Sequence, residues 1–329
     1  MVAVVVIGAL LLWQLLDVVL LVFAAVLFAI ILRSLAALIE AHTPLVLPWS
    51  LALSALLIAA LVGGFAYLLG AQVHAQSMSL ATRIPELIDA LSVRFGIEEL
   101  QGELLERAQQ WTTGGGVVGK LVGYTSGLIG VVVNVLLVVF AGIYFAVDPE
   151  LYRRGALRLV PRGLRSEAGS AFDNAGQALR QWLVGQLIAM AIVGALTTAG
   201  LYFIGIPSAL ALGFLAGMLE FVPIVGPIAS AIPAVLVALA EDSSRVFWVV
   251  GLYVVVQQVE NHLLLPLLTR RTVDVPPAVT LFALLALGIL FGPVGVLLGA
   301  PLTVVLYVAV KQFYVRDTLG EKTSVPGES

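Results

Sequence analysis

Residues 206–240 read IPSALALGFLAGMLEFVPIVGPIASAIPAVLVALA, an apolar run long enough for two short helices but cut by proline, glycine and one glutamate. The segment FVPIVG at 221–226 corresponds to FGPVG at 291–295, and a further proline follows each of them. Proline interrupts a helix because it lacks a backbone donor, and glycine weakens one because it lacks a side chain. We therefore expect two broken helical hairpins, at 206–240 and 275–314.

The whole chain has the composition of a membrane protein. Of its 329 residues, 60% are hydrophobic and 11% are charged, and the mean hydropathy is +1.07. A soluble domain is about 45–50% apolar and about 25% charged, so most of this chain needs lipid as its solvent. The composition predicts an all-α polytopic integral membrane protein, with about eight or nine membrane segments of the usual length.

The same composition argues against several classes of function. The net charge is −3 and no basic run is dense enough to follow a phosphate backbone, so we expect no nucleic-acid partner. The chain has no cysteine and its three histidines lack metal-binding spacing, so we expect no metal site and no cofactor. The chain also lacks G-x-S-x-G and paired metal-ligand motifs, so we do not expect an enzyme.

Apolar runs bounded by charges predict the order of the segments. The first run divides at Gln14 and Asp17 into spans at 1–16 and 18–39, and we favour a tight helical hairpin over one long bent helix. The later clear spans are 50–70, 118–147, 183–205 and 246–266. The predicted organisation is N-terminal transmembrane helices at 1–70, an amphipathic arm outside the membrane at 71–117, a long transmembrane helix at 118–147, an Arg-rich cytoplasmic helix at 148–182, a transport core at 183–315 and a disordered cytoplasmic tail at 316–329.

Basic residues predict the orientation through the positive-inside rule. Six arginines lie within 148–182, which places this segment in the cytoplasm and the C-terminal tail on the same side of the inner membrane. The hairpins at 206–240 and 275–314 then enter from opposite sides, as in the inverted repeats whose broken segments mark a transporter's substrate site. The alternative is a chance match, because glycine and proline are common in transmembrane helices.

Polar side chains inside the predicted core are the candidate site. Glu220 directly precedes the first break, and a carboxyl group there is costly unless it is paired, hydrated or protonated. A second cluster lies in VVVQQVENH, where Gln257, Glu260 and Asn261 share one helical face. Glu260 is suited to carry a proton or a cation, and the neighbouring amides to bind a polar solute. The alternative places this cluster in the headgroup zone, where polar residues cost little.

Three stretches resemble the hallmark motifs of the AI-2E family of transporters: 206–239, the run QQVENHLLLPLL and following residues at 257–285, and FGPVGVLLGAPL at 291–302. The resemblance implies export of small solutes such as a furanone-type quorum-sensing signal, with other members similar to sodium or lithium/proton antiporters. It also implies a homo-oligomer, with a pentamer as the expected form. The family's pattern maps onto Pro223, Gly226, Gln258, Glu260, Asn261, Gly292 and Gly295, to which Pro293 is added by its place in the second break.

Three functions follow in order. The first is an exporter of a small solute or signal molecule, in which Glu220 or Glu260 would supply any coupling to protons or cations. The second is a Na⁺(Li⁺)/H⁺ antiporter that uses the same carboxylates, and the third is a membrane scaffold that moves no solute. The expected partners are therefore a small-molecule solute or monovalent cation, membrane lipid and further copies of the chain.

Overall fold

The computed structural model describes residues 2–64, 67, 125–264, 266, 275–321 and 323–328, without the side chains of 2–14, 125–129 and 240. The predicted arm at 71–117 lies outside the described residues. Within the described ranges the chain is helical and has no strand. The helices are α1 (Val2–His42), an unlabelled helix (Leu47–Gly64), α5 (Thr125–Val147), α6 (Pro149–Arg158), a 3-10 turn (Arg162–Leu164), α7 (Arg165–Ile204), α8 (Ala209–Leu219), α9 (Val225–Glu241), α10 (Ser243–Val259), a π-helical turn (Glu260–Leu264), α12 (Pro277–Ala309) and a second π-helical segment (Val310–Arg316).

The helices have the length and composition of membrane spans. Among the described residues, five stretches are long and apolar enough to cross a bilayer, and α8 and most of α9 are shorter apolar helices. This confirms the all-α polytopic membrane fold predicted from composition. The five stretches are Leu15–His42, Leu47–Gly64, Gly130–Val147, Arg162–Ile204 and Pro277–Arg316.

The N-terminal segment is one continuous helix, so the predicted hairpin at 1–39 is wrong. Asp17 lies within α1 and is exposed. An isolated polar residue does not break a helix, and residues 9–43 contain neither proline nor glycine. The helix ends shortly before Pro44, as expected for residues that precede a proline. The exposed face of α1 next to Asp17 is apolar, which is what a lipid-facing helix requires.

The Arg-rich segment predicted at 148–182 forms α6, the 3-10 turn and the first part of α7. The Asp148 carboxylate caps α6 by accepting a hydrogen bond from the Leu151 N–H at 3.1 Å. Arg153 of α6 donates two hydrogen bonds to the Asp173 carboxylate of α7, at 2.8 and 2.6 Å. From there α7 continues without interruption into the predicted span at 183–205.

Both predicted broken hairpins are present. In the first, α8 and α9 are separate helices that pack against each other. The second is formed by α12, which bends at Gly292, where φ is +61°. Its halves fold back on each other: a Cβ on Gly299 would lie 2.8 Å from the Leu284 side chain, although a straight helix would separate these residues by about 22 Å. Their insertion from opposite sides of the membrane stays a prediction.

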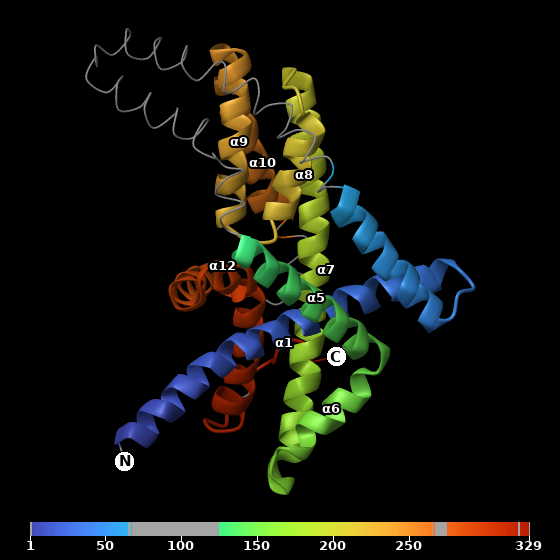
Figure 1. The fold of residues 1–329 in the computed structure, drawn as a ribbon, viewed down its shortest axis with the longest axis vertical. Helices are drawn as coiled ribbons and strands as arrows, with labels where there is room; N and C mark the ends of the chain where they lie inside the picture. Colours follow the sequence, from blue (N-terminus) through green and yellow to red (C-terminus); the bar gives the residue numbers. More distant parts are fainter. Residues whose placement is uncertain are drawn as a thin grey trace.

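Both hairpins pack against α7, as Figure 1 shows. Its N-terminal half packs against α12, with Ala178 in a buried cluster with Val304 and Val308. Its C-terminal half packs against α8 and α10. In Figure 1 the group α8, α9 and α10 lies beside the upper half of α7, and α12 lies beside the lower half.

The C-terminal segment, predicted to be disordered from residue 316, packs against α7 in the structure. Val325 is 3% exposed and joins the cluster around Ala178. Arg316 pairs with Glu328, and Lys311 Nζ donates a hydrogen bond to the Ser324 carbonyl at 3.2 Å. The buried Val325 and the two polar contacts therefore hold the C-terminal segment against α7, although its composition alone predicts disorder.

Candidate functional site

Small residues hold α8 close to α7. Gly213 and Gly217 of α8 face Gly194 and Thr198 of α7, and a Cβ on Gly217 would lie 3.1 Å from the Gly194 Cα. Small residues four positions apart let helix backbones approach closely in membranes, where van der Waals packing drives association. This close packing positions Glu220, the residue that follows α8.

The turn after α8 is tight and strained. The Val225 N–H donates to the Pro223 carbonyl at 2.8 Å across Ile224, whose φ of +71° and ψ of −49° describe a γ-turn. A positive φ in a β-branched residue is a sparsely populated conformation that costs about 1–3 kcal/mol. Gly226 has no room for a side chain, because a Cβ there would lie 3.0 Å from the Glu220 Cα. Pro223 and Gly226, both predicted as site residues, thus shape this turn.

Glu220 is the most deeply buried carboxyl group of the described residues, with 1% of its surface exposed. The Gln186 side chain of α7 donates a hydrogen bond to the Glu220 backbone carbonyl at 2.6 Å. Without that bond the carbonyl at the end of α8 would lack a partner from the helix. α7 therefore positions Glu220 both by close helix packing and by this hydrogen bond.

A second carboxyl group comes from the end of α10. Glu260 accepts a hydrogen bond from Gln257 Nε2 at 2.9 Å, and the helix changes to a π-helical turn at Glu260. Such turns are frequent at functional sites. Glu220 and Glu260 are close neighbours, since both line one small cavity. Because an ionised carboxylate only accepts hydrogen bonds, two neighbouring carboxyl groups favour a shared proton or a bound cation.

A small cavity of about 10 Å³ lies beside the two carboxyl groups, room for roughly one water molecule. Thr197 of α7 also faces it, and its buried Oγ1 has no hydrogen-bond partner among the described residues. A buried hydroxyl without a partner is costly, so it marks a place for a polar occupant. The lining residues are Val193, Thr197, Ala216, Glu220, Pro227, Ser230, Tyr253, Val256, Gln257 and Glu260.

The remaining polar groups of the wall are bonded to the protein. The Tyr253 hydroxyl donates to the Ser230 carbonyl at 3.0 Å, and Ser230 Oγ donates to the Pro227 carbonyl at 3.1 Å. These bonds connect α10 to α9 and fix one side of the cavity. They leave Thr197 Oγ1 and the carboxyl pair as the groups able to bind an occupant.

The structure brings together some of the predicted site residues and separates others. Glu220, Gln257 and Glu260 line the cavity, whereas Gln258 and Asn261 are exposed and do not line it. The residues of the second bend do not line it either: Gly292, Pro293 and Gly295.

The two bends nevertheless meet at one apolar cluster. Phe221 and Phe291 occupy corresponding positions in the two motifs, and both pack against the cluster that contains Leu179 and Leu183 of α7. The Trp182 ring contacts the Phe221 ring edge to face, with 5.9 Å between centroids. Among the described residues the bends are thus joined by apolar packing, while the one buried carboxyl group, that of Glu220, lies at the first bend.

Four polar residues of this region were missing from the sequence prediction: Gln186, Thr197, Ser230 and Tyr253. Each is a polar residue in an apolar stretch, which is the signal that could have singled it out. Tyr253 and Gln257 are also four positions apart, so they share a helical face with Glu260. Thr197 and Ser230 come from other helices, and only the packing of α7 and α9 against α10 brings them close.

Comparison with known proteins identifies relatives that are transport proteins by name. The sequence model of the AI-2E family transporter matches residues 1–315. The Bacillus subtilis (strain 168) protein YrrI, provisionally named a transport protein, is 31% identical over 174 residues, which is 53% of this chain and 49% of YrrI. The Escherichia coli (strain K12) protein PerM, provisionally named a permease, is 26% identical over 230 residues, 69% of this chain and 63% of PerM.

A third relative carries a substrate in its name. The AI-2 transport protein TqsA of Escherichia coli (strain K12) is 28% identical over 147 residues, covering 44% of this chain and 43% of TqsA. The chain spans about half the length of three of the curated relatives that it matches.

Proposed function

The chain belongs to the AI-2E family of transporters, and from that premise we propose that it moves a small solute across the membrane, with the Glu220–Glu260 pair binding the proton or cation that is exchanged. Members of this family are named as transport proteins, which argues for a carrier and against an enzyme. The solute proposed first is a small organic signal, by analogy with the name of TqsA.

The closeness of the buried Glu220 and the half-buried Glu260 in the wall of one small cavity carries this proposal. Ionisable groups inside membrane proteins are expensive to bury, and they mark ion pathways and proton relays. Two carboxyl groups in contact cannot both hold a full negative charge without a proton or cation between them. The Thr197 hydroxyl, which has no partner in the described part of the chain, adds a neutral oxygen ligand for the same occupant.

The size of the cavity favours an ion over an organic molecule at this point. About 10 Å³ accommodates one water molecule or a dehydrated small cation, while pockets for organic ligands are about 300–1,000 Å³. This observation supports the second candidate, a Na⁺(Li⁺)/H⁺ antiporter in which the cation replaces the shared proton. In an exporter the same pair would bind the coupling ion, and the solute would cross the membrane through another part of the protein.

Orientation and assembly complete the proposal. We place the chain in the inner membrane with α6, the start of α7 and the C-terminus in the cytoplasm, because the arginines gather there. We also propose a homo-oligomer, with a pentamer as the form that the family resemblance implies.

The test uses proteoliposomes that contain a pH-sensitive dye. A pulse of sodium or lithium, and then of a furanone-type solute, is applied to the wild type and to Glu220→Gln and Glu260→Gln. Gln keeps the shape of the side chain and removes the charge. Glu241→Gln is the matched control, because Glu241 is an exposed residue at the end of α9.

The outcomes separate the three functions. A proton flux evoked by the cation alone, lost in both variants and kept in the control, supports the antiporter. A flux evoked only by the organic solute, with the same losses, supports a coupled exporter. Wild-type flux in both variants refutes the assignment of the carboxyl pair, and no flux of cation or solute supports the scaffold.

A further inference from the structure

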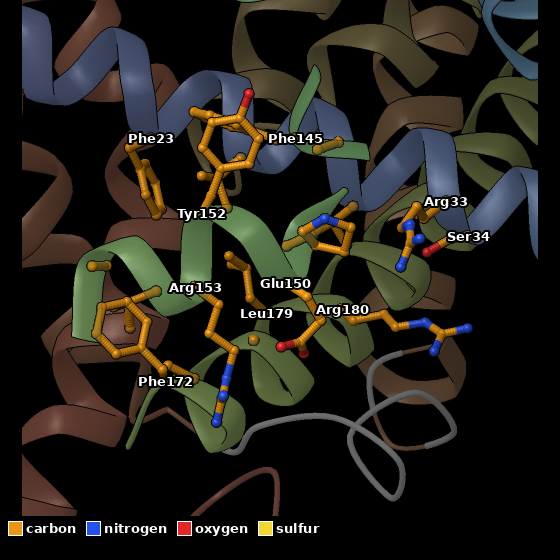
Figure 2. A pocket seen from close by; sticks show the side chains of 18 of the residues that line it. Phe23, Arg33, Ser34, Phe145, Glu150, Tyr152, Arg153, Phe172, Leu179 and Arg180 are labelled. Carbon is orange, nitrogen blue, oxygen red and sulfur yellow. The ribbon is translucent and has the colours of Figure 1, made fainter. Parts of the chain in front are cut away.

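A second, larger cavity lies between α1, α6 and α7, about 920 Å³ in volume (Figure 2). Its walls are mostly apolar and include Phe23 and Val26 of α1 and Leu179 of α7. Figure 2 shows Phe23 at one end and the side chains of Arg33 and Arg180 at the other. The cavity therefore combines a long apolar wall with a cationic end.

Within the described part of the chain, the two arginines at that end keep guanidinium N–H groups that no carboxylate pairs with. Arg33 belongs to an apolar, membrane-length stretch of α1, and its Nε donates to the Ala146 carbonyl at 2.8 Å. The described residues supply no carboxylate to Arg33 and no hydrogen-bond partner to Arg180. Arg153, which also lines the cavity, is different because it pairs with Asp173.

The two acidic residues that line the cavity, Glu40 and Glu150, form no ion pair with Arg33 or Arg180 among the described residues. Glu150 lies 3.9 Å from Arg154, so a neighbour within α6 already offsets its charge. Glu40 lies near the end of α1 and has no ion-pair partner among the described residues. A cation inside a membrane span is costly unless an anion compensates its charge. Arg33 in particular therefore favours a bound anion.

This arrangement fits a ligand with a phosphate at one end and a hydrocarbon chain at the other. A free inorganic anion would leave the apolar wall unused, and a neutral hydrocarbon would leave the arginines unpaired. Basic pockets between transmembrane helices on the cytoplasmic side bind anionic lipid headgroups. Arginine is suited to phosphate because its planar fork donates two parallel hydrogen bonds.

We propose that this cavity binds an anionic phospholipid, with its phosphate between Arg33 and Arg180 and an acyl chain along Phe23, Val26 and Leu179. The site is separate from the carboxyl pair: along α7, Arg180 and Val193 are about 20 Å apart at 1.5 Å per residue. The proposal therefore holds or fails independently of the proposed transport mechanism.

Native mass spectrometry of the purified protein tests it, with phosphatidylglycerol and phosphatidylcholine as probes. The wild type is expected to retain phosphatidylglycerol at least tenfold more than phosphatidylcholine, and Arg180→Gln to lower that retention at least fivefold. Arg158→Gln is the matched control, since it removes the same charge from an exposed position outside the cavity. Arg33→Gln is expected to act like Arg180→Gln; if it fails to fold, Arg180→Gln alone decides.

Three results would overturn the proposal. Equal retention of both lipids would mean that no anionic headgroup is recognised. Displacement of phosphatidylglycerol by excess inorganic phosphate would indicate a simple anion site. A change of subunit number in Arg180→Gln, with lipid retention unchanged, would mean that a second copy of the chain covers the cavity.

Discussion

Replacing Gly217 with alanine adds one methyl group where α8 packs against α7. The new Cβ would lie 2.6 Å from the Met190 carbonyl oxygen and 3.1 Å from the Gly194 Cα. Both neighbours are backbone atoms of α7, so neither can move aside as the end of a flexible side chain would. The helices must separate by about 0.8 Å to restore an ordinary contact, and a gap of that size forfeits a quarter to a half of each dispersion contact.

The expected loss follows from two opposing terms. Overpacking of this kind costs about 1–3 kcal/mol. Alanine is better than glycine in a helix by about 1 kcal/mol, which offsets part of the cost. Gly251 of α10 provides the control, because a Cβ there has nothing within 4 Å. The free energy of unfolding of Gly251→Ala should rise by up to about 1 kcal/mol, and the difference between the variants should equal the packing cost of about 1–3 kcal/mol.

Unfolding in mixed micelles, followed by circular dichroism, measures that difference. The proton flux in proteoliposomes is measured in parallel, because Glu220 lies three residues after Gly217, directly follows α8 and should move with it. Gly217→Ala is expected to lower both stability and flux relative to Gly251→Ala. If the two variants unfold within about 0.5 kcal/mol of each other, the α7–α8 contact does not position the site and the reasoning fails.

Three further predictions concern the turn and the C-terminal end. Ile224→Gly should raise the free energy of unfolding by about 1 kcal/mol, because glycine adopts the γ-turn without strain; unchanged or lower stability would contradict the strain. The hydrogen bond from Arg316 holds the pKa of Glu328 below its ordinary value of 4.5. A spin label on the C-terminal segment should therefore be immobile above pH 4.5 and gain mobility as the pH falls through the lower pKa of the folded state. In Glu328→Gln the same label should already be mobile at pH 7. Gln312→Ala should cost about 1–3 kcal/mol by leaving Asn174 unpaired, since Asn174 Nδ2 donates to Gln312 Oε1 at 3.0 Å, and a double-mutant cycle with Asn174→Ala should show coupling.

The broken hairpins and the glutamates could be predicted because their signals are local. Proline, glycine and a carboxyl group in an apolar run each conflict with an undisturbed lipid-facing helix. Glu220 and Glu260 therefore stood out, although forty residues separate them. That they lie close together depends on how α8 and α10 pack against α7, which no spacing rule contains.

The errors have a physical cause as well. A polar break at Gln14 and Asp17 predicts a hairpin only if the backbone can turn there, and without proline or glycine the helix continues. Asn261 was placed on the face of Gln257 by the period of an α-helix, and it is exposed where the π-helical turn follows Glu260. The composition of the tail beyond residue 316 predicts disorder, but Val325 packs in a buried cluster with residues of α7 and α12.

The continuity of α7 ties these parts together. The helix has 40 residues and is about 60 Å long, and it contains no proline at which it could bend. Its first half carries Arg180 and the wall of the lipid cavity, and its second half carries Thr197 beside the carboxyl pair. Between them, Leu183 belongs to the cluster that holds Phe221 and Phe291. Because packed interfaces rearrange between discrete states and do not deform smoothly, a shift of either hairpin against α7 would have to repack this cluster, which contains a residue from each bend.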